Sequence, residues 1–346
     1  MTTLTTTLGN VTLKNPLIAG SAEHLIEADG IRRALKAGVG AVVVKSVNES
    51  DAARDQLQRA EYMLFDEHWN PVEWGPDAPA SAFVACRSGL TPQPFDQWLE
   101  QTVQMDREAR ACDSYAVPSV ILADLDTSVR MAKQIEQAGL RILEFNIGTP
   151  YASQAQGAVS TELDPGNVSM FVSVIRKAVS LPLWVKITGQ SERVPELAAA
   201  AFAAGGDAVV MAGRSLGLIP DVETLEPMLG TTLGVGGFWN LPLTCQWLAL
   251  SRAKVGAGKP LIATNGAQTG LDIARMMLAG ASAVEMSSPV MIRGAETLSS
   301  ALADFQAYLA RKGLNAAELI GVAADRRVAF PARPLKTDNW KTYVST

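Results

Sequence analysis

The sequence predicts an α/β fold, a (β/α)8 TIM barrel, and two observations lead to this prediction. The first is a pattern that occurs four times, at 37–45, 138–146, 204–212 and 279–287: Ala-Gly, two linking residues, then a short apolar run. The glycine is typical of a helix end, and the apolar run is typical of a parallel strand buried on both faces. The second is that strand and helix patterns alternate along the chain, as successive βα units do.

Four further apolar runs bring the expected strands to eight, at 16–20, 119–123, 183–187 and 261–264. Stretches with helical patterns alternate with them, at 26–37, 94–111, 126–138, 166–180, 192–204, 241–255, 269–279 and 293–311. This many alternating pairs favours a closed barrel over an open doubly wound sheet, which usually has about five to seven strands.

Two segments add to this pattern. The stretch "TTLTTTLGNVTLKN" predicts an N-terminal β-hairpin that turns near Gly9 and Asn10 and closes the bottom of the barrel. Residues 47–92 form a long polar and aromatic insertion after the second strand, and a loop of that length is usually functional. We expect it to act as a lid that carries substrate specificity. Since no linker is visible, we expect one domain over residues 1–346.

Composition and charge argue against several classes of protein. The chain has 346 residues, 48% of them hydrophobic and 19% charged, as in an ordinary soluble globular protein. The net charge is −5 and no Lys/Arg run exceeds two residues, which argues against a nucleic-acid partner. We expect a cytoplasmic protein with no membrane partner, because neither a secretion signal nor a long apolar run is visible. The three cysteines and two histidines are scattered, so we expect no metal site.

Polar residues at the expected strand ends are candidates for a site, because barrel chemistry lies at the C-terminal ends of the strands. These residues are Lys45, Asn146, Lys186 and Ser287, with Asn265 and Gly266 just beyond the seventh strand. A lysine that ends a buried strand needs a ligand or another anion. Pairing of each lysine with a neighbouring carboxylate, or its extension to solvent, is the alternative for Lys45 and Lys186.

Glycine and serine loops late in the chain are candidates for an anion site. They are "GVGGFW" (234–239), "TNGAQTG" (264–270) and "EMSSPVM" (285–291). Barrels often hold a phosphate on backbone N–H groups in the loops after strands seven and eight. The residues that fit this role are Gly236, Gly237, Gly266, Ser287 and Ser288.

These segments together resemble a known family. In order and spacing, "NPLIAGSAEH", "GAVVVKS", "EFNIGTPY", "LPLWVKIT", "GGFWNLPL" and "TNGAQTGLDIARMMLAGASAVEMSS" resemble the FMN-dependent dihydroorotate dehydrogenases and the flavin domain of dihydropyrimidine dehydrogenases. The resemblance covers about residues 4–312. It implies an FMN oxidoreductase that acts on CH–CH groups by hydride transfer between a substrate C–C bond and flavin N5. It also implies a homodimer.

The resemblance also implies roles for individual residues. Gly20, Ser21 and Ala22 would border the flavin, and Lys45 and Ser46 would contact its ring near the substrate. Asn146 would bridge flavin and substrate, and Lys186 would hold the pyrimidine edge of the ring. The residues that would take the ribityl phosphate are Gly236, Gly237, Asn265, Gly266, Ser287 and Ser288.

The sequence departs from the family at the proton-transfer position and at the substrate contacts. Thr149 stands where the family has a Cys or Ser base, and its poorly acidic hydroxyl would need a positioned water or lysine. Of the asparagines that surround the pyrimidine, Asn146 is retained. Tyr151 and Arg214 stand at two of the other positions, and the third falls near Cys86 or Arg87.

The replacing side chains predict an anionic substrate that is larger or more aromatic than dihydroorotate. Tyr151 and Trp239 offer aromatic surface, and Arg87 and Arg214 offer guanidinium groups for a carboxylate or phosphate. Trp239 packed on the barrel top, and arginines that are solvated or bind the FMN phosphate, are the alternatives. Without cysteine clusters to relay electrons, the chain would need a partner subunit or a diffusible electron acceptor.

Three other functions stay open at this point. One is genuine dihydroorotate or dihydropyrimidine oxidation with an atypical site. Another is a non-catalytic flavin-binding homologue, for which Thr149 is the hint. A tRNA enzyme similar to dihydrouridine synthases is disfavoured by the acidic charge.

Overall fold

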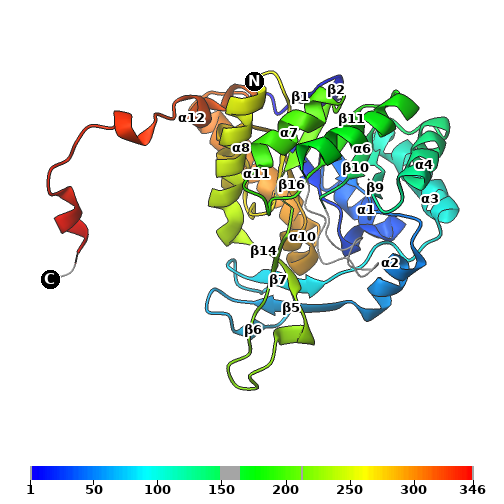
Figure 1. The fold of residues 1–346 in the computed structure, drawn as a ribbon, viewed down its shortest axis with the longest axis horizontal. Coiled ribbons are helices and arrows are strands. Elements are labelled where there is room, and N and C mark those ends of the chain that lie inside the picture. The colour runs from blue at the N-terminus through cyan, green and yellow to red at the C-terminus, as the bar shows by residue number, and fades with distance from the viewer. Residues whose placement is uncertain (1, 149–163, 212, 345–346) are drawn as a thin grey trace.

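The computed structural model describes residues 2–148, 164–211 and 213–344, which form a parallel barrel surrounded by helices (Figure 1). The barrel strands are β3 (Leu17–Ala19), β4 (Ala41–Val43), β8 (Tyr115–Val117), β9 (Ser119–Ile121), β10 (Leu143–Asn146), β11 (Leu183–Lys186), β12 (Ala208–Met211), β15 (Leu261–Thr264) and β16 (Ala281–Met286). The main helices are α1 (Ala28–Lys36), α3 (Phe95–Ala111), α4 (Leu125–Gln137), α6 (Pro165–Ala178), α7 (Val194–Ala203), α8 (Leu241–Val255), α9 (Gly270–Leu278) and α11 (Glu296–Lys312). The predicted TIM barrel is confirmed.

A proline separates the third predicted strand, at 119–123, from a barrel strand that was not predicted, β8. The sheet order is β8-β4-β3-β16-β15-β12-β11-β10-β9, so its two ends are strands that adjoin in the chain on either side of Pro118. Proline has no N–H to donate, and the ladder breaks there. Because β8 pairs with β4 and β9 pairs with β10, these two strands close the barrel.

The four predicted helix-ending glycines all have positive φ. The values are 93° at Gly38, 79° at Gly139, 103° at Gly205 and 124° at Gly280. Other residues rarely adopt this region, and each glycine therefore ends its helix and turns the chain into the next strand.

The interior of the barrel is apolar at its bottom. Trp184, Ile262 and other inward side chains form a fully buried cluster there, and the N-terminal hairpin completes it. This hairpin consists of β1 (Thr6–Leu8) and β2 (Val11–Leu13), with Gly9 at φ 60° in its turn. Leu8 and Leu13 belong to the same cluster, so the hairpin closes the bottom as predicted.

The insertion at 47–92 is more regular than the predicted loop. It contains α2 (Asp51–Asp55), η2 (Gln56–Arg59), β5 (Glu61–Phe65), β6 (Pro71–Val72) and β7 (Phe83–Arg87). Two strands from a second insertion, β13 (Ser215–Gly217) and β14 (Leu233–Gly236), complete an antiparallel sheet in the order β13-β14-β7-β5-β6. The insertion after the second strand is confirmed, but its strands were not predicted, because the strands that pair with β7 include one far away in the sequence. Its role as a lid that carries substrate specificity stays a prediction. In Figure 1 this sheet lies at one end of the barrel.

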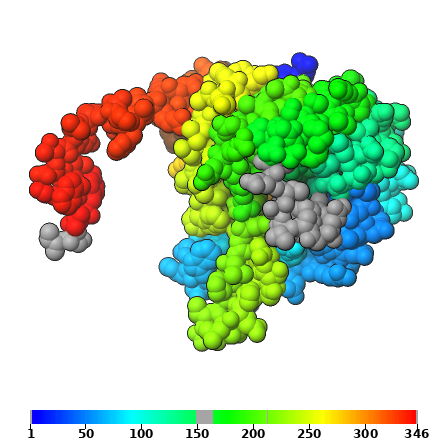
Figure 2. All heavy atoms as spheres, viewed as in Figure 1, coloured from blue at the N-terminus to red at the C-terminus, as the bar shows by residue number. Residues whose placement is uncertain are grey.

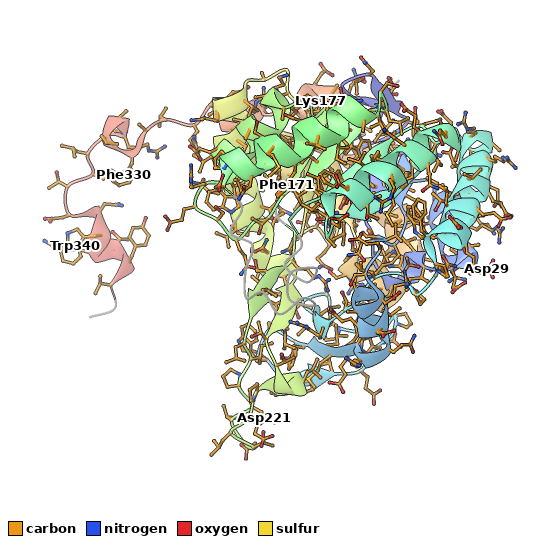
Figure 3. All side chains as sticks on the ribbon, turned by 45° about the vertical axis from the view of Figure 1, so that its right-hand side comes forward. Asp29, Phe171, Lys177, Asp221, Phe330 and Trp340 are labelled. Carbon is orange, nitrogen blue, oxygen red and sulfur yellow. The ribbon has the colours of Figure 1, made fainter. Side chains whose placement is uncertain are left out.

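Beyond α11 the chain forms η5 (Ala316–Leu319) and α12 (Val322–Asp325) and then leaves the body. Figure 2 shows the last segment as an arm that projects from the body, with η6 (Phe330–Ala332) and η7 (Asn339–Tyr343) on it. Figure 3 places Phe330 and Trp340 on this arm, and Phe330 is 89% exposed. No helix in the described part of the chain is long and apolar enough to cross a membrane. One domain over residues 1–346 stays a prediction.

The hairpin gives a test of barrel closure. We expect Leu13→Ala to lower the free energy of unfolding by about 2–5 kcal/mol, because Leu13 is fully buried and its removal leaves a cavity. Thr12→Ala, on the exposed face of the same strand, should change it by less than about 0.5 kcal/mol. Urea unfolding of both variants measures the difference, and equal losses would mean that the hairpin does not stabilise the barrel by burial.

Candidate active site

A pocket lies at the C-terminal ends of the barrel strands. Lys45, Asn146 and Lys186 line it from the barrel, and Val84 and Cys86 line it from β7 of the antiparallel sheet. The barrel supplies the floor and the sheet supplies an outer wall. This is the end at which barrel enzymes carry their chemistry.

Most of the predicted site residues come together in this pocket. Those that line it are Ser21, Ala22, Lys45, Ser46, Asn146, Lys186, Arg214, Gly236, Asn265, Gly266, Ser287 and Ser288. Four others, Gly20, Arg87, Gly237 and Trp239, are not among the lining residues. Thr149 and Tyr151 lie outside the described residues. The roles assigned to all these residues stay predictions.

Three of the residues that do not line the pocket, Gly20, Gly237 and Trp239, are closely packed against other side chains. A Cβ on Gly20 would collide with the Ser287 side chain, and a Cβ on Gly237 would collide with Phe83. Trp239 packs edge-to-face on the ring of Phe83, with centroids 6.2 Å apart. This contact agrees with the alternative in which Trp239 packs the top of the barrel.

Lys45 forms a buried ion pair with Glu23 of η1 (Glu23–Leu25), with Nζ 2.9 Å from Oε1. The Tyr62 hydroxyl donates to the same oxygen at 2.8 Å. Burial raises the pKa of Glu23, but the charges of Lys45 and Arg214 and these hydrogen bonds outweigh it and lower the pKa to about 2. Glu23 was not predicted. A buried Lys45 requires a negatively charged partner, and the glutamate in "GSAEH" is a candidate for it that the sequence offers.

Lys186 lies between two buried carboxylates. Its Nζ is 2.7 Å from Glu285 Oε2 and 3.3 Å from Glu144 Oε2. Burial lowers the pKa of Lys186, but the two carboxylates more than offset it and the net shift is upward. Neither carboxylate was predicted, although an acidic residue inside an apolar strand pattern, as in "ILEFN" and "AVEMS", is a signal for a partner. Each predicted lysine therefore pairs with a carboxylate of the chain.

A chain of hydrogen bonds through three serines connects Glu144 to the pocket. Ser119 Oγ donates to Glu144 Oε1 at 2.7 Å, and Ser46 Oγ lies 2.8 Å from Ser119 Oγ. Ser21 Oγ lies 3.2 Å from Ser46 Oγ. Ser21 and Ser46 line the pocket, whereas Ser119 and Glu144 lie beneath its floor.

Arg214 lines the outer wall of the pocket. Its guanidinium donates to Cys86 Sγ and, at 2.7 Å, to Ser88 Oγ. Burial raises the pKa of the Cys86 thiol, and Arg214 offsets part of this rise. Arg214 thus places a cation at the pocket, whereas Arg87 extends to the backbone carbonyl of Thr232 at 3.4 Å.

Another part of the pocket lining comes from the loops that follow β15 and β16. Asn265 and Gly266 have φ of 72° and 120°, and a Cβ on Gly266 would lie 2.7 Å from Leu241 Cα. The short helix α10 (Ser288–Arg293) begins directly after β16, where phosphate-binding barrels carry such a helix. In the described residues, no group of three His, Cys, Asp or Glu side chains could hold a metal ion.

Comparison with known proteins agrees with this geometry. The family described as dihydroorotate dehydrogenase has a sequence model that matches residues 79–309. The chain belongs to the dihydroorotate dehydrogenase family. It is therefore an oxidoreductase of the class that acts on CH–CH groups.

The curated relatives differ in how much of the chain they match. Dihydroorotate dehydrogenase B (NAD(+)), catalytic subunit, of Methanocaldococcus jannaschii is 25% identical over 325 residues, covering 92% of this chain and 98% of the relative. The protein of the same name from Pyrococcus furiosus is 24% identical over 324 residues, covering 91% and 97%. Dihydroorotate dehydrogenase A (fumarate) of Lactobacillus delbrueckii subsp. bulgaricus is 32% identical over 202 residues, covering 58% of this chain and 64% of the relative.

The Glu23 ion pair predicts part of the pH dependence of stability. The pKa of Glu23 is lower in the folded protein than its ordinary 4.5, so its contribution is present above that pH and is lost as pH falls toward 2. Between about pH 6 and about pH 3, Glu23→Gln should lose about 2 kcal/mol less unfolding free energy than the wild type. Urea unfolding at both pH values measures this, with Glu27→Gln, an exposed carboxyl nearby, as control. Parallel losses in the wild type and Glu23→Gln would contradict the lowered pKa.

Proposed function

We propose that the chain is an FMN-dependent oxidoreductase that acts on an anionic substrate other than dihydroorotate. When bound, FMN would supply hydride transfer between its N5 and a substrate C–C bond. The observation that carries the proposal is a pocket at the C-terminal end of the barrel that is lined both by lysines and by the late glycine and serine loops. The proposal of FMN also rests on the family resemblance.

The residues of the pocket fit FMN in two respects. The backbone at Gly236, Asn265 and Gly266, with the start of α10, offers close approach and N–H donors to a phosphate. Lys186 would hold the pyrimidine edge of the ring, where a cation stabilises the negative charge of the reduced cofactor. Its two carboxylate partners fix the ammonium in position.

Residues near the first strands would contact the ring and the substrate. Ser21, Ala22, Lys45 and Ser46 line one side of the pocket. Asn146 Oδ1 accepts the Gly148 N–H at 3.1 Å, which holds the amide at the end of β10. A role for Thr149 in proton transfer, and roles for Tyr151, Arg87 and Trp239 in substrate binding, stay predictions.

The proposed substrate class rests on Arg214. A guanidinium beside a pocket attracts a carboxylate or phosphate, and the wall around it consists of Cys86 and Ser88 where orotate recognition would call for amides. Genuine dihydroorotate oxidation is the second candidate, because the curated relatives are named for that activity. A non-catalytic flavin protein is the third, and it would bind FMN without being reduced by any substrate.

We also propose a homodimer with no nucleic-acid partner, which passes electrons to a partner subunit or a diffusible acceptor. The M. jannaschii relative is named a catalytic subunit, which supports an assembly with a second protein.

Binding of FMN can be tested by placing a charge at the phosphate end. Ser288→Asp puts a carboxylate at the start of α10, where it would repel the phosphate, and we expect FMN affinity to fall at least about tenfold. Ser300→Asp, on the exposed face of α11, should leave affinity unchanged. Quenching of FMN fluorescence measures both. Protein that is colourless and takes up no added FMN would refute the cofactor, and equal affinities would refute the placement of the phosphate.

Substrate class can be tested by anaerobic bleaching of the flavin. Dihydroorotate with fumarate, and uracil with NADPH, should give no sustained turnover if the proposal holds. A panel of larger carboxylates is then tested for flavin bleaching. Any compound that bleaches the wild type should bleach Arg214→Ala at least about tenfold more slowly, because this variant lacks the guanidinium that would pair with the anion. Rapid turnover of dihydroorotate by the wild type would establish the second candidate. Bleaching by no compound would favour the third.

A further inference from the structure

A buried carboxylate, Glu144, lies beneath the floor of the pocket, and the proposed function gives it no part in proton transfer. Glu144 is fully buried and is not among the lining residues of the pocket. Its two oxygens have different partners: Oε1 accepts from Ser119 Oγ at 2.7 Å, and Oε2 faces Lys186 Nζ at 3.3 Å. Through Ser119 and Ser46, hydrogen bonds connect Glu144 to the pocket.

The direction of these hydrogen bonds is fixed by the carboxylate. An ionised carboxylate can only accept, so the single hydroxyl proton of Ser119 points to Glu144. In the 2.8 Å contact between Ser46 and Ser119, Ser46 must then be the donor. The lone pairs of Ser46 Oγ are left to accept a proton from the pocket side, where Ser21 Oγ lies 3.2 Å away. In each of the three hydrogen bonds, Ser21 to Ser46, Ser46 to Ser119 and Ser119 to Glu144, the donor is therefore the residue nearer the pocket.

Lys186 would keep a carboxylate partner if Glu144 were neutral. Lys186 is closer to Glu285, at 2.7 Å, than to Glu144, at 3.3 Å. Two buried carboxylates that share one ammonium repel each other, which favours protonation of one of them. Burial raises the pKa of Glu285, Lys186 lowers it and Glu144 raises it, with a net rise. Among the described residues, the other charges that line the pocket are the Lys45–Glu23 pair and Arg214.

We propose that Ser46, Ser119 and Glu144 form a proton relay that removes the substrate proton from the pocket. The inference rests on the proposed function. In this proposal Ser46, and not Thr149, receives the substrate proton: when bound, FMN would supply hydride transfer from one substrate carbon, and the proton of the adjacent carbon passes to Ser46 Oγ. The Ser46 proton passes to Ser119, and the Ser119 proton passes to Glu144. The substrate gains a C=C bond, FMN gains the hydride, and Glu144 becomes a neutral acid beside the remaining Lys186–Glu285 pair.

The relay differs from a network that only satisfies buried polar groups, because it changes the protonation of Glu144. Light with EDTA reduces bound FMN without any substrate and adds negative charge near Lys186, which should draw a proton to Glu144. Time-resolved infrared spectroscopy should show the carbonyl band of a protonated carboxyl rising as the flavin bleaches. Glu144→Gln should remove this band. If that variant does not fold, Glu144→Asp assigns the band by a shift in its frequency.

Matched variants at Ser119 test the path. In Ser119→Ala the flavin should bleach at the wild-type rate, while the carboxyl band should appear at least about tenfold more slowly. Ser119→Thr keeps a hydroxyl and should restore the rate. Ser128→Ala is the control, because Ser128 is an equally buried serine whose Oγ donates to Asp124 O in α4, away from the pocket.

Two results would overturn the relay: no carboxyl band in the wild type, or equal band rates in Ser119→Ala and Ser119→Thr. Failure of the proposed cofactor looks different, because the protein would then be colourless. Failure of the proposed substrate class does not affect this test, because light with EDTA reduces the flavin without a substrate. In that event an acid pH jump on the flavin-free protein measures the same Glu144 band. If the band appears about tenfold more slowly in Ser119→Ala than in the wild type, the relay is still supported. If it appears at the same rate in both, the relay is rejected.

Discussion

The pocket floor depends on the cluster in which Glu144 and Glu285 hold Lys186. Three ionisable side chains lie in the barrel interior, and none has more than 13% of its surface exposed. Removing such charges from water costs several kcal/mol each unless every one has a partner. Side chains from β10, β11 and β16 meet this requirement only if the barrel is closed and its strands are in register. The charged floor therefore requires the closed barrel.

The barrel interior changes from apolar to polar along its axis. Trp184 lies in the apolar bottom, and Lys186, two residues further along β11, reaches the floor of the pocket. At the neighbouring strand β10, Ile142 likewise lies in the apolar bottom and Glu144, two residues further on, contacts Lys186. Because residues i and i+2 of a strand face the same side, one strand contributes to both layers. The apolar layer excludes water from below, which strengthens the electrostatic interactions above it.

Periodic features of the fold could be predicted from the sequence, whereas features that depend on distant partners could not. The Ala-Gly pattern predicted the positive φ of Gly139 and Gly205, because a local backbone requirement restricts the residue type. The pairing of β7 with β14 joins segments about 150 residues apart, and no local pattern encodes it. Likewise Lys45 and Lys186 were found at their strand ends, but their carboxylate partners come from other elements and were missed.

The outer wall of the pocket is built from two insertions, one after β4 and one after β12, that pair with each other in a sheet of their own. The strands of this wall form no ladder with the barrel, so its side chains can be exchanged without disturbing the pairing that closes the barrel. After a gene duplication, the wall of one copy could change while the floor keeps its side chains. The architecture separates the floor of the pocket from its outer wall, and natural selection can act on each at its own pace.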